Sequence, residues 1–110
     1  MSISQKISAD GRKVTIIIKG HFDYKVSNEF RDAYRNIPGH ESISYHVYLR
    51  DVDYMDSSAL GMLLLLREHA KCRGGEVIIE RPSKLIDNIL KVANFEQLFT
   101  IDYSSQVYAS

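Results

Sequence analysis

Residues 45–70, YHVYLRDVDYMDSSALGMLLLLREHA, are the most informative part of the chain. Tyr45 to Leu49 is rich in β-branched and aromatic residues, which is typical of a strand. Ala59 to Ala70 consists almost entirely of helix-forming residues. The acidic Asp56-Ser57-Ser58 turn therefore lies where a strand gives way to a helix, and functional residues collect at such junctions in α/β sheets.

The two serines stand at the predicted N-terminus of this helix. The first N–H groups of a helix lack internal partners and carry partial positive charge, so a Ser or Asp there caps them. The same N–H groups also stabilise a phosphate that is added at this position. Two interpretations remain open on spacing alone: a simple helix cap, or a place where phosphate is added, held and sensed.

The rest of the chain alternates between strand and helix patterns. Ile3 to Ser8 and Lys13 to Lys19 predict a hairpin about an Asp10-Gly11 turn. The other predicted elements are a helix from Ser27 to Asn36 ended by Pro38-Gly39, a strand from Tyr45 to Leu49, a helix from Ser57 to Cys72 ended at Gly74-Gly75, a strand from Glu76 to Glu80, a helix started by Arg81-Pro82-Ser83 and a short strand from Phe99 to Tyr103. This order predicts an α/β fold, a mixed sheet of about five strands with parallel crossovers, covered by helices.

Composition limits the function classes. The chain has 110 residues, 45% of them hydrophobic and 25% charged, so we expect one domain over residues 1–110. Its net charge is zero and its Lys and Arg residues are dispersed, which argues against nucleic-acid binding through phosphates. The longest apolar run, Leu60 to Leu66, is too short for membrane insertion, and Met1 to Lys6 shows no signal region. We therefore expect a cytoplasmic protein.

Neither cysteine nor histidine indicates a metal or cofactor site. Cys72 is the only cysteine, so there is no internal disulfide and no cysteine metal cluster. The histidines show no ligand spacing and are interpreted as structural; they are His21, His40, His46 and His69. We expect no cofactor.

The segment Asp56-Ser57-Ser58-Ala59-Leu60-Gly61 resembles the signature Met-Asp-Ser-Ser/Thr-Gly-Leu-Gly of the STAS domains of bacterial anti-sigma-factor antagonists. Weaker similarities lie at the expected distances, in Gly20-His21-Phe22-Asp23, Gly74-Gly75-Glu76-Val77 and Asn94-Phe95-Glu96-Gln97-Leu98-Phe99. The resemblance covers nearly the whole chain and implies a STAS fold. It also suggests that Ser104 to Ser110 is the stub of a terminal helix found in longer relatives.

The resemblance implies a partner switch in signal transduction and transcription regulation. Ser57 would be phosphorylated by an anti-sigma factor that is also a serine kinase, and dephosphorylated by a serine phosphatase. The unphosphorylated form, a monomer when free, would bind the anti-sigma factor. We expect partner contacts at Asp23, Tyr24, Tyr54, Asp56 and Ser58. Ala59 replaces the usual Gly of the motif, so we expect a stiffer turn and a less close fit to a kinase.

Each of these residues also has a structural interpretation. Asp23 would begin a turn, Asp56 would cap the helix and Ser58 would satisfy a backbone N–H. Asp51 and Asp53 are interpreted as solvated loop acids. The leucines from Leu63 to Leu66 would either pack in the core or leave part of a stripe for a partner.

Two other functions remain open. One is a constitutive STAS subunit of an ABC-type lipid-transport complex in a Gram-negative bacterium, which needs no phosphorylation. The other is an enzyme with Ser57 as nucleophile. The sequence has no Gly-x-Ser-x-Gly elbow and no Gly-rich phosphate loop, so we expect no enzymatic activity.

Overall fold

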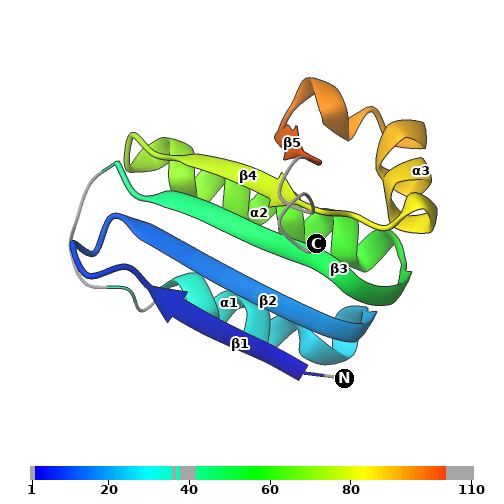
Figure 1. The fold of residues 1–110 in the computed structure, drawn as a ribbon, viewed down its shortest axis with the longest axis horizontal. Coiled ribbons are helices and arrows are strands. Elements are labelled where there is room, and N and C mark those ends of the chain that lie inside the picture. The colour runs from blue at the N-terminus through cyan, green and yellow to red at the C-terminus, as the bar shows by residue number, and fades with distance from the viewer. Residues whose placement is uncertain (1, 36, 38–41, 104–110) are drawn as a thin grey trace.

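A computed structural model describes residues 2–35, 37 and 42–103, in which a single mixed sheet carries helices on one face (Figure 1). The elements are β1 (Ser2–Ile7), β2 (Lys13–Phe22), the 3-10 helix η1 (Tyr24–Val26), α1 (Ser27–Arg35), β3 (Ser44–Met55), α2 (Ser57–Cys72), β4 (Glu76–Glu80), α3 (Lys84–Val92), the 3-10 helix η2 (Phe95–Gln97) and β5 (Thr100–Asp102). The strand order is β1-β2-β3-β4-β5. The predicted α/β fold with a mixed sheet is confirmed.

The predicted hairpin opens the fold. β1 and β2 are antiparallel, with Ile7 opposite Val14. Asp10 organises the turn, because its Oδ1 accepts hydrogen bonds from Ser8 Oγ at 2.6 Å and from the Arg12 N–H at 3.0 Å. Gly11 has φ 73°, a conformation that favours glycine.

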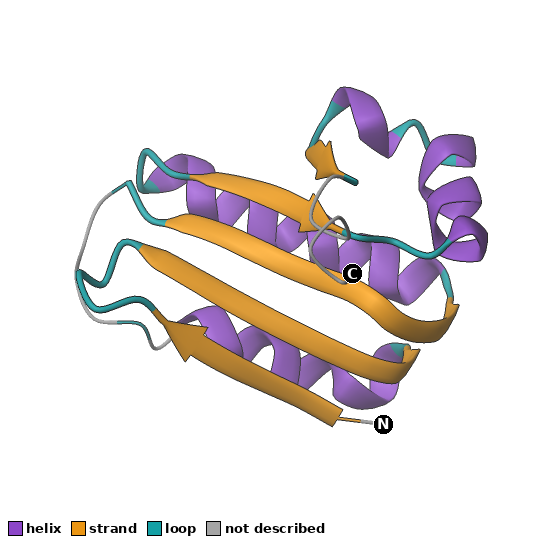
Figure 2. Cartoon of the chain, viewed as in Figure 1, coloured by secondary structure: helices purple, strands orange, loops and turns teal. Residues whose placement is uncertain are grey.

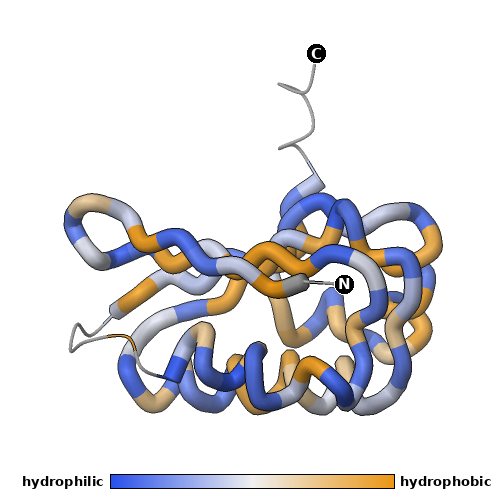
Figure 3. The backbone as a smooth tube through the Cα atoms, turned by 90° about the horizontal axis from the view of Figure 1, so that it is seen from below, coloured by the Kyte–Doolittle hydropathy of each residue, from blue (hydrophilic) through white to orange (hydrophobic). Residues whose placement is uncertain are grey.

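The remaining neighbouring strands are parallel, and a helix connects each pair (Figure 2). Helices α1 and α2 lie on the same face of the sheet (Figure 3). Alternate strand residues point to that face and form the core with the helices; they include Val14, Ile16, Ile18, Tyr45, Val47, Leu49, Val77 and Ile79. The opposite face of the sheet is not covered by a helix of the described chain.

Strand β3 is much longer than the predicted Tyr45–Leu49. It continues to Met55 because β2 also continues, to Phe22, and supplies backbone hydrogen-bond partners along the way. The interpretation of Asp51 and Asp53 as loop acids is therefore wrong, although both side chains are exposed. The β2–β3 register shifts twice, between Ile17/Lys19 and Gly20/His21, and Gly20 adopts φ 84° at the second shift.

Other boundaries differ slightly. Helix α2 and strand β4 have their predicted bounds. Helix α3 begins at Lys84 after Ser83, whose Oγ accepts from the Ile86 N–H at 3.3 Å, and β5 is shorter than predicted. The short helix η1 was not predicted. Pro38-Gly39, His40 and Ser104 to Ser110 lie outside the described residues.

The leucine run divides between core and surface. Leu63 and Leu66 are fully buried, whereas Leu64 is 37% exposed and Leu65 62% exposed. Two leucines therefore pack in the core and two others face outward, and the use of the outward leucines by a partner stays a prediction. No helix of the described ranges is long and apolar enough to cross a membrane.

Candidate functional site

The functional residues predicted from the motif come from the ends of two paired strands. Phe22 at the end of β2 lies opposite Met55 at the end of β3 in the parallel register. Asp23 follows Phe22 and Asp56 follows Met55, so both carboxylates stand at the same edge of the sheet. The α2 helix starts from this edge (Figure 1).

Asp56 is the N-cap residue of α2. Its backbone is extended, with φ −117° and ψ −175°, and its Oδ1 accepts from the Ala59 N–H at 3.1 Å. The Ser58 hydroxyl donates to the same oxygen at 2.6 Å. This bond from Ser58 is the main cause that lowers the pKa of Asp56, and the backbone N–H bonds add to the effect. Asp56 is thus a carboxylate at neutral pH.

The two neighbouring serines have different surroundings. Ser58 is half-buried, and its hydroxyl is held by Asp56 rather than by the backbone N–H we expected. Ser57 is exposed and, within the part of the chain that the structure describes, its hydroxyl has no hydrogen-bond partner. Ser57 is therefore the hydroxyl that remains accessible for modification, while Ser58 organises the cap.

Asp23 is buried, with 8% of its surface exposed, and it caps the short helix η1. Its Oδ1 accepts from the Lys25 N–H at 3.0 Å, as expected for the start of a turn. A cavity of about 260 Å³ opens beside it and is also lined by Gly20, His21, Lys25 and Asp53. Asp23 thus lines this cavity and exposes only a small part of its surface.

The two tyrosines flank this edge of the sheet. Tyr24 is 66% exposed on η1 and Tyr54 is 48% exposed near the end of β3. The Tyr54 ring contacts the His21 ring, with centroids 5.3 Å apart, and His21 Nε2 lies 3.7 Å from Asp53 Oδ1. His21 and Asp53 thus join the predicted residues at this edge, although the motif did not single them out.

Ala59 points in the opposite direction from Ser57. It is fully buried in the core, so its methyl group occupies space inside the protein and not on the surface of the motif. The substitution of Gly by Ala therefore leaves the exposed surface around Ser57 unchanged. This position of the side chain gives no support to a poorer fit of a kinase.

An apolar surface continues from Ser57 along α2. Leu60 lies one turn after Ser57 and Leu64 one turn further, on the same side of the helix. Between α2 and α3, a groove of about 320 Å³ is lined by Leu60, Leu85, Asn88, Ile89, Val92 and Ala93. Leu85 and Val92 are 57% and 86% exposed. We call Leu60, Leu64, Leu65 and the lining of this groove the apolar stripe.

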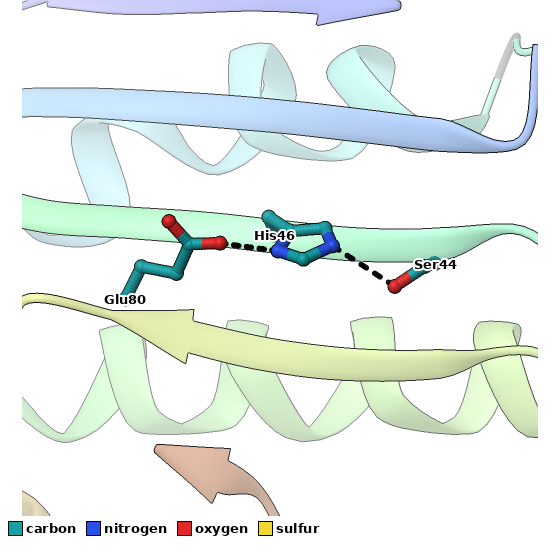
Figure 4. A network of polar contacts seen from close by, with 3 residues as sticks. All are labelled: Ser44, His46 and Glu80. Atoms are coloured by element: carbon teal, nitrogen blue, oxygen red, sulfur yellow. Dashed lines mark hydrogen bonds and ion pairs between the residues drawn. The ribbon is translucent and has the colours of Figure 1, made fainter. Parts of the chain in front are cut away.

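A second polar cluster lies on the open face of the sheet, far along β3 from Ser57. His46 Nε2 is 3.0 Å from Ser44 Oγ, and His46 Nδ1 bonds the Glu80 carboxylate (Figure 4). The order Ser-His-Glu matches that of a hydrolytic triad. However, the Ser44 N–H already donates to Arg12 O at 2.8 Å, so it cannot contribute to an oxyanion hole. The cavities of 260 to 350 Å³ in the described chain do not include these three residues either.

This cluster is therefore a cross-strand bridge between β3 and β4. Ser44 and His46 share a face because they are two residues apart on a strand, which the sequence could have indicated. Glu80 is brought to them only by the pairing of Tyr48 with Glu80. Among the described residues, no group of three His, Cys, Asp or Glu side chains is arranged to hold a metal ion.

Two comparisons with known proteins point to the same family. A family model described as "Mlab, STAS domain" matches residues 6–101. A STAS-domain containing protein of Pseudomonas aeruginosa, PA14_20770, is 46% identical over 101 residues, which cover 92% of this chain and 99% of that protein.

Two solved structures share the fold at low identity. A putative anti-sigma factor antagonist of Thermotoga maritima superposes with a TM-score of 0.75 at 18% identity, covering 92% of this chain and 86% of its own. The anti-sigma factor antagonist SpoIIAA in its unphosphorylated form gives a TM-score of 0.68 at 15% identity, covering 93% and 87%.

Proposed function

The chain belongs to the STAS-domain family, and from this premise we propose that it is a cytoplasmic, phosphorylation-controlled partner switch and not an enzyme. In this proposal its unphosphorylated form binds an anti-sigma factor that is also a serine kinase. Phosphorylation of Ser57 ends that complex, and a serine phosphatase restores it. The observation that carries the proposal is that the Ser57 hydroxyl is exposed, whereas the neighbouring Ser58 hydroxyl is hydrogen-bonded to Asp56.

The position of Ser57 favours its phosphorylation by a kinase. Ser57 is the first residue of α2, where the helix dipole and the N–H groups of the first turn favour an added negative charge. Because Asp56 and Ser58 already form the cap between themselves, a phosphate on Ser57 does not have to break it. The likeness to SpoIIAA, solved in a form described as unphosphorylated, supports the same interpretation.

The phosphate would act on the partner and not on the fold. It adds about 1.5 to 2 negative charges at the start of the apolar stripe, next to Asp56. A partner carboxylate about 6 Å away would cost roughly 3 kcal/mol per unit charge at an effective dielectric near 20. A loss of that size weakens binding about a hundredfold. Desolvation of the phosphate against apolar contacts acts in the same direction.

We assign the partner contacts to the edge around Ser57. Asp23, Tyr24, Tyr54, Asp56 and Ser58 frame it, and the two exposed tyrosines provide the aromatic area that is enriched in interfaces. The apolar stripe begins beside them and supplies surface that a partner can bury. A partner on this surface covers Ser57 directly.

The test is intact-mass measurement of the protein purified from its native host, with Ser57→Ala and Ser58→Ala alongside, and a pull-down with each. We expect a species heavier by one phosphate in wild type and Ser58→Ala, and none in Ser57→Ala. We also expect a partner kinase to be retained best by Ser57→Ala. If phosphate persists in Ser57→Ala, the assignment of the phosphoacceptor is wrong.

The description of the matching family model favours a second candidate, a constitutive Mlab-like subunit of an ABC-type lipid-transport complex. The same experiment separates the two. A transport subunit would retain an ABC-type ATPase equally in wild type and Ser57→Ala, and no phosphorylated species would appear under any growth condition.

A further inference from the structure

The face of the sheet opposite α1 and α2, which no helix of the described chain covers, is the least expected surface of this fold. Sheets of parallel strands are usually covered on both faces, because their crossover connections place helices there. Here β2, β3, β4 and β5 are parallel, yet α1 and α2 lie on one face only (Figure 3). Strand alternation sends Ile17, Tyr48 and Ile78 to the open face, where they are only half-buried.

Charged side chains divide this face into two halves. On the β1–β2 half, alternation places Lys6, Lys13 and Lys19 outward. On the β4–β5 half it places Glu76, Glu80 and Asp102 outward. Strand β3 runs between the halves and carries the Ser44–His46 part of the bridge to Glu80 (Figure 4). Arg81 also lies on the β4–β5 half, since its Nη1 donates to Tyr48 Oη at 3.3 Å. That half therefore carries three acids and one base, against three lysines on the β1–β2 half.

From this pattern we infer that the open face is a self-association surface, on which two copies of this chain pack face to face about a two-fold axis parallel to β3. Two sheets that meet face to face are related by an axis lying between them. An axis across the strands would place β1 over β1, and so Lys over Lys. An axis along β3 places the basic half of each copy over the acidic half of the other, which is the complementary arrangement.

The register identifies one contact of this dimer. Lys13 lies opposite Ser44, and Ser44 lies opposite Glu76, so the three residues form one row across the sheet. Lys13 and Glu76 are both exposed, their strands are two spacings apart, about 10 Å, and the ion pairs of the described residues do not join them. The two-fold rotation about the axis parallel to β3 places Glu76 of the second copy over Lys13 of the first. By symmetry, Glu76 of the first copy lies over Lys13 of the second.

The area of the open face limits how tightly two copies can associate. Five strands at about 4.8 Å spacing, over about 20 Å of length, offer roughly 500 Å² per copy. That area is at the small end of specific interfaces, where complexes are weak and transient. The monomer that we expect from the sequence is therefore the dilute form. Helices α1 and α2 lie on the other side of the sheet, and Ser57 is the first residue of α2, so both copies leave the apolar stripe open.

Sedimentation velocity on the full chain between about 10 µM and 1 mM tests the proposal. Wild type should approach twice its mass of 12.6 kDa as concentration rises. Lys13→Glu and Glu76→Lys should each weaken the dimer about tenfold or more, because like charges then face each other twice. Lys71→Glu is the matched control, since this exposed lysine is on α2, on the other side of the sheet.

Mixing the two single variants gives the decisive result. In the mixed dimer, the Lys13→Glu chain presents an acid at both positions and the Glu76→Lys chain presents a lysine at both, so both contacts again pair opposite charges. We expect association to return on mixing although each variant alone associates about tenfold or more weakly than wild type. A wild type that stays monomeric at every concentration would overturn the proposal. So would a dimer that survives Lys13→Glu, or variants that fail to associate when mixed while far-UV circular dichroism shows both folded.

Discussion

Two adjacent serines at the start of α2 have separable roles at the scale of single residues. Ser58→Ala removes the hydroxyl that donates to Asp56 at 2.6 Å, so we expect the free energy of unfolding to fall by about 0.5–1 kcal/mol at pH 7. Ser57→Ala removes an exposed hydroxyl and should change it by less than about 0.5 kcal/mol. Urea unfolding of the three proteins measures both differences.

The pH dependence of this effect has a defined sign. The Ser58 hydroxyl lowers the pKa of Asp56 in the folded protein below its ordinary value of 3.8. The resulting stabilisation is complete above that value and is lost as pH falls through the folded pKa. The difference between wild type and Ser58→Ala should therefore narrow in acid. A difference that stays constant down to about pH 2 would contradict the role of the charged Asp56.

At this scale the sequence predicted the cap but not the partner of each hydroxyl. The Asp-Ser-Ser pattern between a strand and a helix is enough to indicate an N-cap at Asp56, and the structure confirms it. We expected the Ser58 hydroxyl to accept a hydrogen bond from a backbone N–H, and it donates one to the Asp56 carboxylate instead. Which of these two hydrogen bonds forms depends on the side-chain rotamers of Ser58 and Asp56, and a residue pattern does not specify rotamers.

At the scale of elements, two glycines near α2 provide a matched pair. A Cβ added at Gly75 would lie 2.1 Å from the backbone oxygen of Ile43, so Gly75→Ala must displace the main chain between α2 and β4. We expect a loss of about 2 kcal/mol or more. At Gly61, inside α2, an added Cβ meets nothing within 4 Å, so Gly61→Ala should stabilise the helix by about 0.5–1 kcal/mol.

Thermal unfolding of both variants checks this prediction. The melting temperature should fall clearly in Gly75→Ala and rise slightly in Gly61→Ala, by a few degrees per kcal/mol. If the two changes were of similar size and sign, the close approach of Gly75 to Ile43 would not be a constraint on the fold.

Helix and strand positions followed well from local pattern, with one clear exception. Helix α2 and strand β4 are bounded by strong local signals, the Asp56 cap and the Gly74-Gly75 turn, and their predicted ends are correct. Strand β3 was predicted too short because Asp51 and Asp53 resemble loop residues. Its extension depends on the hydrogen bonds that β2 offers along its whole length, which is a long-range effect.

For the whole molecule, register is the quantity that a single sequence did not provide. The pairing of Phe22 with Met55 places Asp23 and Asp56 at one edge, and the pairing of Tyr48 with Glu80 completes the bridge to His46. The α/β alternation predicts that such pairings exist but not which residues meet. The candidate site could therefore be located by its motif, whereas His21 and Asp53 entered it only through the structure.

The packing around Ser57 determines how the proposed switch should behave. Ser57 is exposed on a rigid helix start, anchored by the buried Ala59, Leu63 and Leu66, so a negative charge there has no packed core to disturb. An acid at the first helical position is also favourable to the helix dipole. We expect Ser57→Asp to keep the melting temperature within a few degrees of wild type while losing the partner kinase.

Amide chemical shifts distinguish this surface mechanism from a conformational one. In Ser57→Asp, shift changes should be confined to the start of α2 and to the paired ends of β2 and β3. Ser58→Asp is the matched control, because it adds the same charge but also removes the hydroxyl that holds Asp56. It should lower stability, and Ser57→Asp should not. Changes that spread through β4, α3 and β5 in Ser57→Asp would show that the charge remodels the fold, and partner release could then not be assigned to charge at the interface alone.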